Sequence, residues 1–167
     1  MPDGESPADL VRSAQRGDRL AMARLIDELA PAVGRWCGPI ALQDAPDAAQ
    51  ETMIAVLRGI NGLREPAAIY GWARAIAIRE AVRVANRARG EIPTELPDLP
   101  EPGDPQLAVD VRTVLARLRP EHRAVLMLRD LEGLDERDAA ALLNMPVGTV
   151  KSRLSRARER FRKEWLR

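Results

Sequence analysis

The segment 134–165, LDERDAAALLNMPVGTVKSRLSRARERFRKEW, decides the fold of the C-terminal part of this 167-residue chain. Asp135 is a good helix N-cap, and the apolar residues after it have helical spacing. Asn144 stands where the chain must bend, and Asn is one of the few residues that tolerate the left-handed backbone region. Pro146 suits the first turn of a following helix, where its missing N–H costs nothing. The segment therefore predicts two helices joined by a tight turn.

The second of these helices has two contrasting faces. Apolar residues three or four apart form one inner stripe, which consists of Val147, Val150, Leu154, Ala157, Phe161 and Trp165. The opposite face is basic, with small hydroxyls toward its N-terminal end: Thr149, Ser152, Arg153, Arg156, Arg160 and Lys163. Small polar residues of this kind can reach base edges in a major groove, while arginines bind phosphates or guanines. The tight turn between two short helices favours a helix-turn-helix over a merely solvated charged face.

Composition predicts an all-α protein. Apolar residues make up 46% of the chain and aromatic residues only 3%, so the cores must consist mainly of aliphatic side chains. No useful stretch alternates with a period of two. The net charge is only +1, but residues 91–110 carry a net charge of −6 and residues 111–167 a net charge of +6. A basic C-terminal module beside an acidic connector indicates nucleic-acid binding by that module.

Several classes of protein are disfavoured by the residues that the chain has. It has one cysteine, Cys37, and one histidine, His122, so neither an internal disulfide nor a Cys/His zinc set can form. Cys37 is expected to be a small buried hydrophobe. No catalytic motif or phosphate-binding loop stands out, and we expect neither enzymatic activity nor a cofactor or metal. The N-terminus lacks a secretion signal and no apolar run reaches membrane-spanning length, which predicts a cytoplasmic protein without a membrane partner.

The rest of the chain divides into a helical domain over residues 1–90, a linker over 91–105 and the C-terminal domain over 106–167. Residues 91–105 contain five prolines and no basic residue, so we expect an extended linker that imposes no fixed geometry on the two domains. Ser6 and Asp18 are the expected N-caps of the first two helices, and Gly38-Pro39 is the expected end of the second. Leu20 and Leu57 are expected to face the core.

The C-terminal sequence resembles a known family. The runs PVGTVKSRLSRARERFR (146–162) and LRDLEGLDERDAAALL (128–143) are similar to the −35-reading domain of bacterial extracytoplasmic-function sigma factors. Asn144 is a departure, because the turn in that family usually has Gly. The resemblance implies contacts to −35 DNA from Arg129, Thr149, Lys151, Ser152, Arg153, Ser155, Arg156 and Arg160.

Two N-terminal segments resemble the same family. DAPDAAQETMIAVL (44–57) looks like its core-polymerase-binding segment, which implies that Asp47, Gln50 and Glu51 face the clamp helices of the polymerase β′ subunit. YGWARAIAIREAVRVANRARG (70–90) resembles the −10-reading helix, although the family commonly has Asn and Asp where Arg79 and Arg83 stand. The loop before that helix holds an unstacked base in such proteins, and Trp72 is expected mainly as a core residue. The implied −10 contacts are Asn61, Tyr70, Trp72, Arg79, Arg83 and Arg87.

The resemblance implies a sigma factor that binds core RNA polymerase, through the β′ clamp helices and the β flap, and directs it to promoter DNA. An anti-sigma factor is a further partner open to such a protein. Two alternatives remain at this point. One is a free-standing helix-turn-helix regulator, which would leave Asp47, Gln50 and Glu51 without a role. The other is a degenerate sigma-like adaptor that binds only protein.

Overall fold

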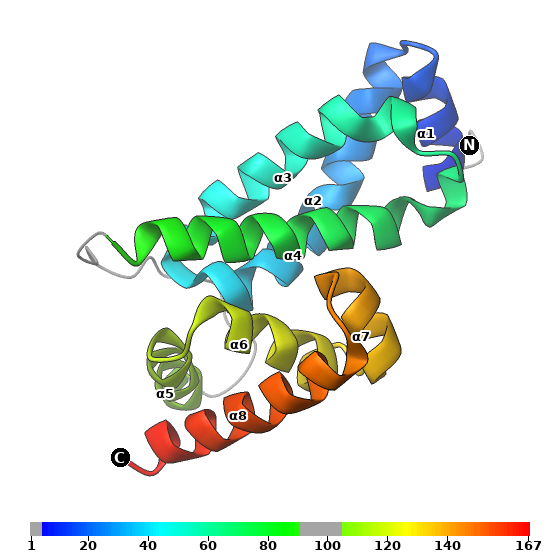
Figure 1. Ribbon diagram of the computed structural model, residues 1–167. Coiled ribbons are helices and arrows are strands. Elements are labelled where there is room, and N and C mark those ends of the chain that lie inside the picture. The colour runs from blue at the N-terminus through cyan, green and yellow to red at the C-terminus, as the bar shows by residue number, and fades with distance from the viewer. Residues whose placement is uncertain (1–4, 91–104) are drawn as a thin grey trace.

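The computed structural model describes residues 5–90 and 105–167, and within these ranges the secondary structure is helical, with no strand (Figure 1). This confirms the expected all-α fold. Most of the predicted linker, residues 91–104, lies outside the described residues. Two groups of helices, one before and one after that segment, pack against each other.

The N-terminal domain contains α1 (Pro7–Gln15), α2 (Arg19–Ala41), α3 (Ala45–Gly59) and α4 (Ile69–Ala88). The long helices α2, α3 and α4 pack together, and α1 covers one end of α2. Both expected N-caps are confirmed. The Ser6 hydroxyl accepts a hydrogen bond from the Asp9 N–H in a capping box, and the Asp18 carboxylate accepts from the N–H groups of Leu20 and Ala21.

The predicted end of α2 at Gly38-Pro39 is wrong, because the helix continues through Pro39 to Ala41. An interior proline costs about 3 kcal/mol. However, the continuing turn buries Ile40 completely, and burying one such side chain recovers about 1.5–3 kcal/mol. Core burial thus offsets the local preference against proline.

Two residues expected in the core of this domain are exposed. Leu20 is 63% exposed in the first turn of α2, and Leu57 is 45% exposed on α3. On α3 the inner face is rotated toward Ala48, Thr52 and Val56, each of which is fully buried. The Thr52 hydroxyl can be buried because it donates a hydrogen bond of 2.7 Å to the Ala48 carbonyl, one turn back. The inner face of α3 was not recognised in the sequence because one of its residues, Thr52, is polar.

The C-terminal domain contains α5 (Pro105–Ala116), α6 (Pro120–Leu126), a π-helical continuation (Met127–Leu131), α7 (Glu136–Leu143) and α8 (Val147–Trp165). Asn144 follows α7 in the left-handed conformation, with φ 51° and ψ 51°, which confirms the predicted turn. Pro146 lies one residue before α8, as its N-cap, rather than inside the first turn. The helix-turn-helix is thus formed by α7 and α8.

The inner stripe of α8 is confirmed at Val150, Leu154 and Ala157, which are buried, but it ends differently from the prediction. Trp165 is 43% exposed and stacks on Phe161, whereas the buried residue of the last turn is Glu164. The Glu164 carboxylate can be buried because three arginines surround it: Arg117 at 3.5 Å, Arg160 at 2.9 Å and Arg167 at 3.4 Å.

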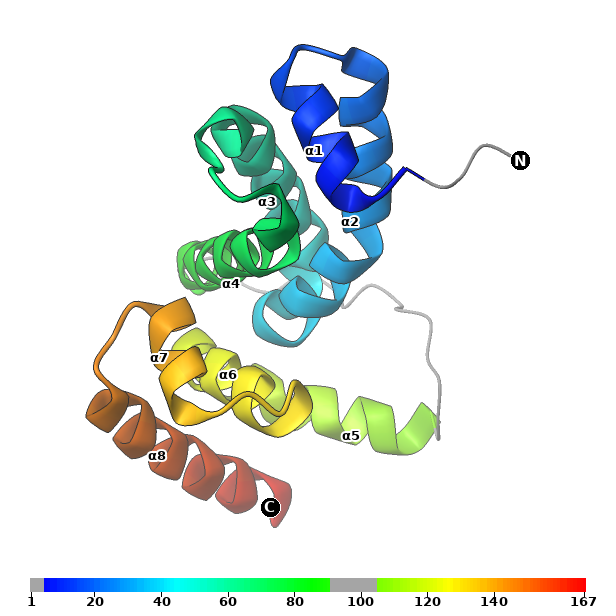
Figure 2. The ribbon, with the colours of Figure 1, turned by 90° about the vertical axis from the view of Figure 1, so that its right-hand side faces the viewer.

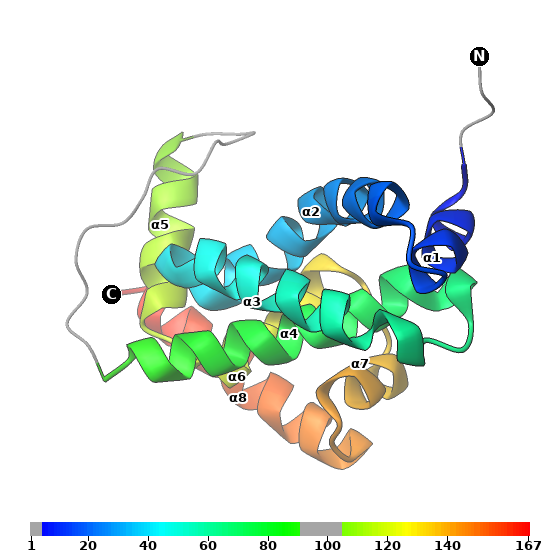
Figure 3. The same cartoon turned by 90° about the horizontal axis from the view of Figure 1, so that it is seen from above.

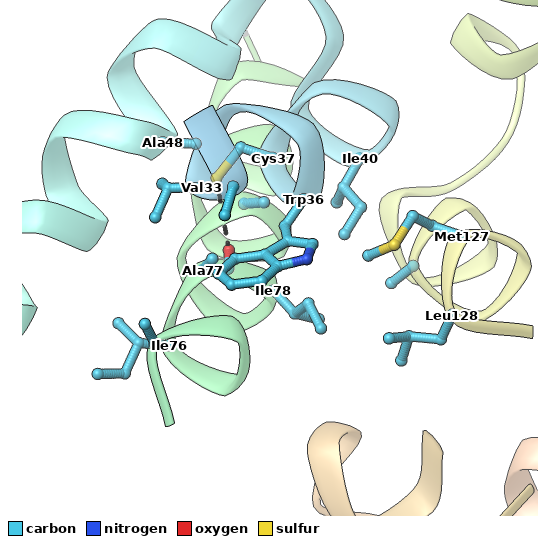
Figure 4. Close-up of a cluster of buried hydrophobic side chains, with 14 of the residues drawn as sticks. Val33, Trp36, Cys37, Ile40, Ala48, Ile76, Ala77, Ile78, Met127 and Leu128 are labelled. Carbon is cyan, nitrogen blue, oxygen red and sulfur yellow. Dashed lines mark hydrogen bonds between the residues drawn. The ribbon is translucent and has the colours of Figure 1, made fainter. Parts of the chain in front are cut away.

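The two domains share an apolar interface. Figures 1 and 2 both show α6 and α7 packed beneath α2 and α4, and Figure 3 shows the same stack from above. In Figure 4, Trp36 and Ile40 of α2 face Met127 and Leu128 of the C-terminal domain, and all four side chains are buried.

At this interface, Arg123 of α6 is only 5% exposed, and its Nε donates a hydrogen bond of 2.7 Å to the Ile40 carbonyl at the end of α2. Its Nη1 donates to the carbonyls of Leu118 and Leu115. One buried guanidinium thus joins the N-terminal domain to the α5–α6 turn. The carbonyls at a helix end lack intrahelical partners, which makes the end of α2 a suitable acceptor.

Candidate nucleic-acid interface

The N-terminal half of α8 presents small polar and basic side chains to solvent. Lys151, Ser152, Ser155 and Arg156 are all exposed, while the tight turn after α7 fixes where this half of the helix begins. The Ser152 hydroxyl donates to the Thr149 carbonyl at 3.1 Å, and Lys151 lies 3.4 Å from the Glu136 carboxylate of α7. An exposed pair of this kind is weak, so Lys151 is free to exchange it for a phosphate.

Three arginines predicted to contact −35 DNA contact other residues of the protein itself. Arg129 is half-buried, and its Nη1 donates to the Leu134 carbonyl in the turn before α7. Arg160 pairs with the buried Glu164. Arg153 is half-buried and lines a hollow of about 250 Å³ between α8, α6 and α4. The hydrogen bond of Arg129 therefore stabilises the turn that precedes the helix-turn-helix.

The predicted polymerase-binding residues lie on α3, away from its core face. Asp47 and Gln50 are exposed, and Glu51 is half-buried. The Glu51 carboxylate lies 3.3 Å from the Arg83 guanidinium of α4, which also pairs with Glu80. These carboxylates raise the pKa of Arg83, with the Glu80 hydrogen bond as the largest cause. The structure thus brings together residues predicted for two different surfaces.

The three arginines of the predicted basic stripe on α4 do not share one environment. Arg87 is exposed near the end of the helix. Arg79 and Arg83 line the same hollow as Arg153 of α8, so this part of α4 faces the C-terminal domain. The neighbouring Asn86 side chain donates a hydrogen bond of 2.9 Å to Glu121 of α6. In this arrangement Arg79 and Arg83 border the C-terminal domain but stay exposed.

The remaining predicted −10 residues lie before α4 and in its first turn. Asn61 is exposed, and Tyr70 is 38% exposed, with its hydroxyl 3.3 Å from Glu28 of α2. Partial burial, followed by the Glu28 charge, raises the pKa of Tyr70. Trp72 is half-buried and packs against α3 at Gly59, where any added Cβ would lie 3.0 Å from the indole ring. Tyr70 is thus the aromatic side chain more available for stacking on a base.

Sequence reasoning missed Arg123 and Glu164, the two charged side chains that organise the domain interface and the end of α8. For Glu164 a signal exists, because Arg160 and Arg167 stand four residues before and three residues after it. For Arg123 no local signal exists, since its acceptor Ile40 is 83 residues away in the chain.

Among residues 5–90 and 105–167, no cluster of three or more His, Cys, Asp or Glu side chains has the geometry to hold a metal ion. In the same ranges, no helix is both long and apolar enough to cross a bilayer.

A helix-turn-helix with a basic outer face, packed on a second helical domain, is the architecture of a DNA-binding protein. Two models of known protein families match this chain. Residues 25–91 match the family model for sigma-70 region 2, and residues 108–161 match the model for sigma-70 region 4. With a relative in that family that is 31% identical over 93% of this chain, these matches show that the chain belongs to the extracytoplasmic-function RNA polymerase sigma factors, and it is a sigma factor that directs transcription initiation.

Individual relatives agree with this assignment. The chain is 31% identical to the sigma factor SigM of Mycobacterium tuberculosis, over 93% of this chain and 83% of that protein. It is 29% identical to the sigma-E factor of Haemophilus influenzae, over 90% of both chains. Matches to both regions do not favour the free-standing regulator or the degenerate adaptor.

Among solved structures, the sigma factor RpoE of Bartonella quintana, in complex with the anti-sigma factor NepR, has a similar fold. The TM-score is 0.67 at 23% identity, over 85% of this chain and 94% of that chain.

Proposed function

We propose that an acidic patch on α3, formed by Asp47 and Glu51 with Gln50 between them, binds the clamp helices of the polymerase β′ subunit, while α8 reads the −35 element. The observation that carries this proposal is the exposed polar and basic face of α8, held by the α7–α8 turn at the start of a helix that fits a major groove. In Figures 1 and 2, α3 and α8 lie on opposite sides of the molecule. One protein can therefore engage polymerase and −35 DNA at the same time.

The −10 element is assigned to α4 and the loop before it. Asn61, Tyr70 and Arg87 are exposed, and together they supply hydrogen-bonding, stacking and cationic groups suited to a melted strand. Arg79 and Arg83 are exposed beside the C-terminal domain, and they become more accessible to DNA when that domain moves off α4. We therefore expect promoter opening to be accompanied by separation of the two domains.

The remaining assignments concern partners and compartment. The β flap of polymerase is the proposed second contact, on the C-terminal domain. An anti-sigma factor is a proposed regulator, because the similar structure of RpoE contains the anti-sigma factor NepR. Since a sigma factor acts on polymerase, we place the protein in the cytoplasm. It has no catalytic role of its own in this proposal.

The test of the polymerase assignment is Asp47→Arg combined with Glu51→Arg. Both residues lie on the outer face of α3, so the fold should persist while binding to core polymerase is lost. Asp27→Arg, an exposed acid on α2, is the matched control for charge reversal. Co-elution with core enzyme and run-off transcription from a cognate promoter measure the effect. Wild-type co-elution by the double variant would show that the patch is assigned wrongly.

A further inference from the structure

A strongly basic cavity of about 450 Å³ lies where the end of α4, the α5–α6 turn and the C-terminal half of α8 meet. Its lining residues are Arg89, Arg117, Arg119, His122, Arg156, Glu159, Arg160 and Lys163. The cations thus come from three elements and from both domains, and they surround one volume. Cations along a single helix face would be typical of a solvated surface. Cations from separate segments that line one cavity are more typical of a binding site for an anion.

The positive charge of the cavity is only partly neutralised. The buried Glu164 is shared by Arg117 at 3.5 Å and Arg160 at 2.9 Å, and Glu159 is the only carboxylate in the lining itself. Six cationic side chains therefore face two carboxylates, which leaves an excess of four positive charges. Such an excess in a confined space attracts anions of high charge.

The pKa of His122 is affected by the same positive charges. Burial is the main cause that lowers its pKa, and the charges of Arg153, Arg119 and Arg156 lower it further, while Glu121 raises it. The neutral form of the imidazole is favoured for these reasons, and its Nδ1 is buried without a hydrogen-bond partner among the described residues. An anion in the cavity would offset the surrounding cations and raise the pKa of His122.

We infer that this cavity binds a small anion that carries a chain of linked phosphoryl groups, such as a nucleoside polyphosphate or an inorganic polyphosphate. Five of its cations are arginines, whose planar donor forks match phosphate oxygens. A concave site with cations from three segments of the chain fits phosphates that are close together in one compact molecule. The backbone of a duplex, by contrast, spreads its phosphates along a convex surface.

Anion binding at this site should affect both the packing of the two domains and the binding of −35 DNA. Arg89 follows α4 in the N-terminal domain, whereas the other cations belong to the C-terminal domain, so an anion that bridges them stabilises the packed arrangement. Arg156 and Arg160 are also proposed −35 contacts. Bound anion should therefore compete with −35 DNA, and this consequence alone rests on the proposed function.

The test uses His122, the only histidine in the chain, as an NMR reporter in the full-length protein without DNA. Titration with tripolyphosphate should give saturable one-to-one binding and raise the pKa of His122. Arg119→Ala should weaken binding at least tenfold. Arg162→Ala, an exposed arginine of α8 that lines a different, apolar hollow, should leave it unchanged.

Equal loss in Arg119→Ala and Arg162→Ala, or orthophosphate binding as tightly as tripolyphosphate, would show only general charge attraction and overturn the proposal. So would an equal His122 shift with a short non-promoter duplex at the same phosphate concentration. A nucleoside triphosphate that binds more tightly than tripolyphosphate assigns the nucleotide as ligand. Equal affinity for the two assigns the phosphate chain alone. Because this readout contains no promoter, it can fail or succeed independently of the −35 assignment.

Discussion

The guanidinium of Arg83 on α4 lies 3.3 Å from the carboxylate of Glu51 on α3, so the proposed polymerase patch and the proposed −10 helix are joined by an ion pair. Polymerase can engage Glu51 fully only by replacing this interaction. Release of Glu51 in turn frees Arg83 for DNA, although Glu80 still holds it. We therefore expect the two proposed surfaces to be coupled through this pair of side chains.

Arg83→Ala should reveal this coupling. The side chains of Arg83 and Glu51 are 50% and 40% exposed, so loss of the pair should cost no more than about 1 kcal/mol of unfolding free energy. Affinity for core polymerase should rise, by up to about fivefold, because Glu51 no longer has to leave a partner. Binding titration with core enzyme measures this change. Arg58→Ala, an exposed arginine of α3, is the control, and an unchanged or lower affinity in Arg83→Ala would contradict the coupling.

Arg123→Met should separate the domains. The methionine keeps much of the apolar contact but removes the hydrogen bonds to the carbonyls of Ile40, Leu115 and Leu118, which should cost about 1–3 kcal/mol. Solution scattering should then show a larger radius of gyration than for wild type. Arg58→Met serves as the control. A variant as compact as the wild type would show that the apolar contacts alone hold the interface.

Arg156 and Arg160 should contribute differently to −35 binding. Arg156 is nearer the N-terminus of α8, so Arg156→Ala should cost about 1–3 kcal/mol and relax base preference at one −35 position. Arg160, which Glu164 holds near the end of the helix, should contact the backbone. Arg160→Ala should weaken all sequences evenly and lower the salt slope by about one unit. Binding to −35 variants over several salt concentrations distinguishes them, and a change of sequence preference in Arg160→Ala would count against this division.

Cys37 should make stability depend on alkaline pH. Burial raises the pKa of its thiol to about 11, above the value of about 8.5 for an unfolded cysteine. Between these two values the unfolded state loses its proton first, so stability is full below about pH 8.5 and falls as pH rises toward 11, by about 3 kcal/mol. Denaturation of wild type and Cys37→Ala over this range isolates the effect, because other titrating groups are shared. Parallel pH dependences would show that Cys37 does not contribute.

The sequence predicted local features well because each depends on a few adjacent residues. Ser6, Asp18 and Asn144 were predicted from the chemistry of their own side chains, and each has the expected conformation or cap. The continuation of α2 through Pro39 was not predictable locally, since the burial of Ile40 decides it.

Contacts between distant segments were the least predictable. The Arg123 bond to Ile40 and the basic cavity both require two domains to pack in one relative orientation, which no periodicity encodes. Among the predicted site residues, Arg129 and Arg153 proved to have contacts with other segments of the chain, which a helical wheel cannot show. Their roles toward DNA stay predictions.

The Arg123 contact also bears on competition among sigma factors in a cell. The names −10 and −35 place the two elements about 25 base pairs apart, or about 85 Å at about 3.4 Å per base pair. Arg83 of α4 and Arg153 of α8, which are proposed to contact these elements, line a single hollow, so we expect that the packed domains cannot reach both. Only the opened fraction of the protein is competent to form a promoter complex, and the apparent dissociation constant for that complex rises in inverse proportion to that fraction. The strength of one buried arginine contact thus helps to set the rank of this factor among all those that draw on the same pool of core polymerase.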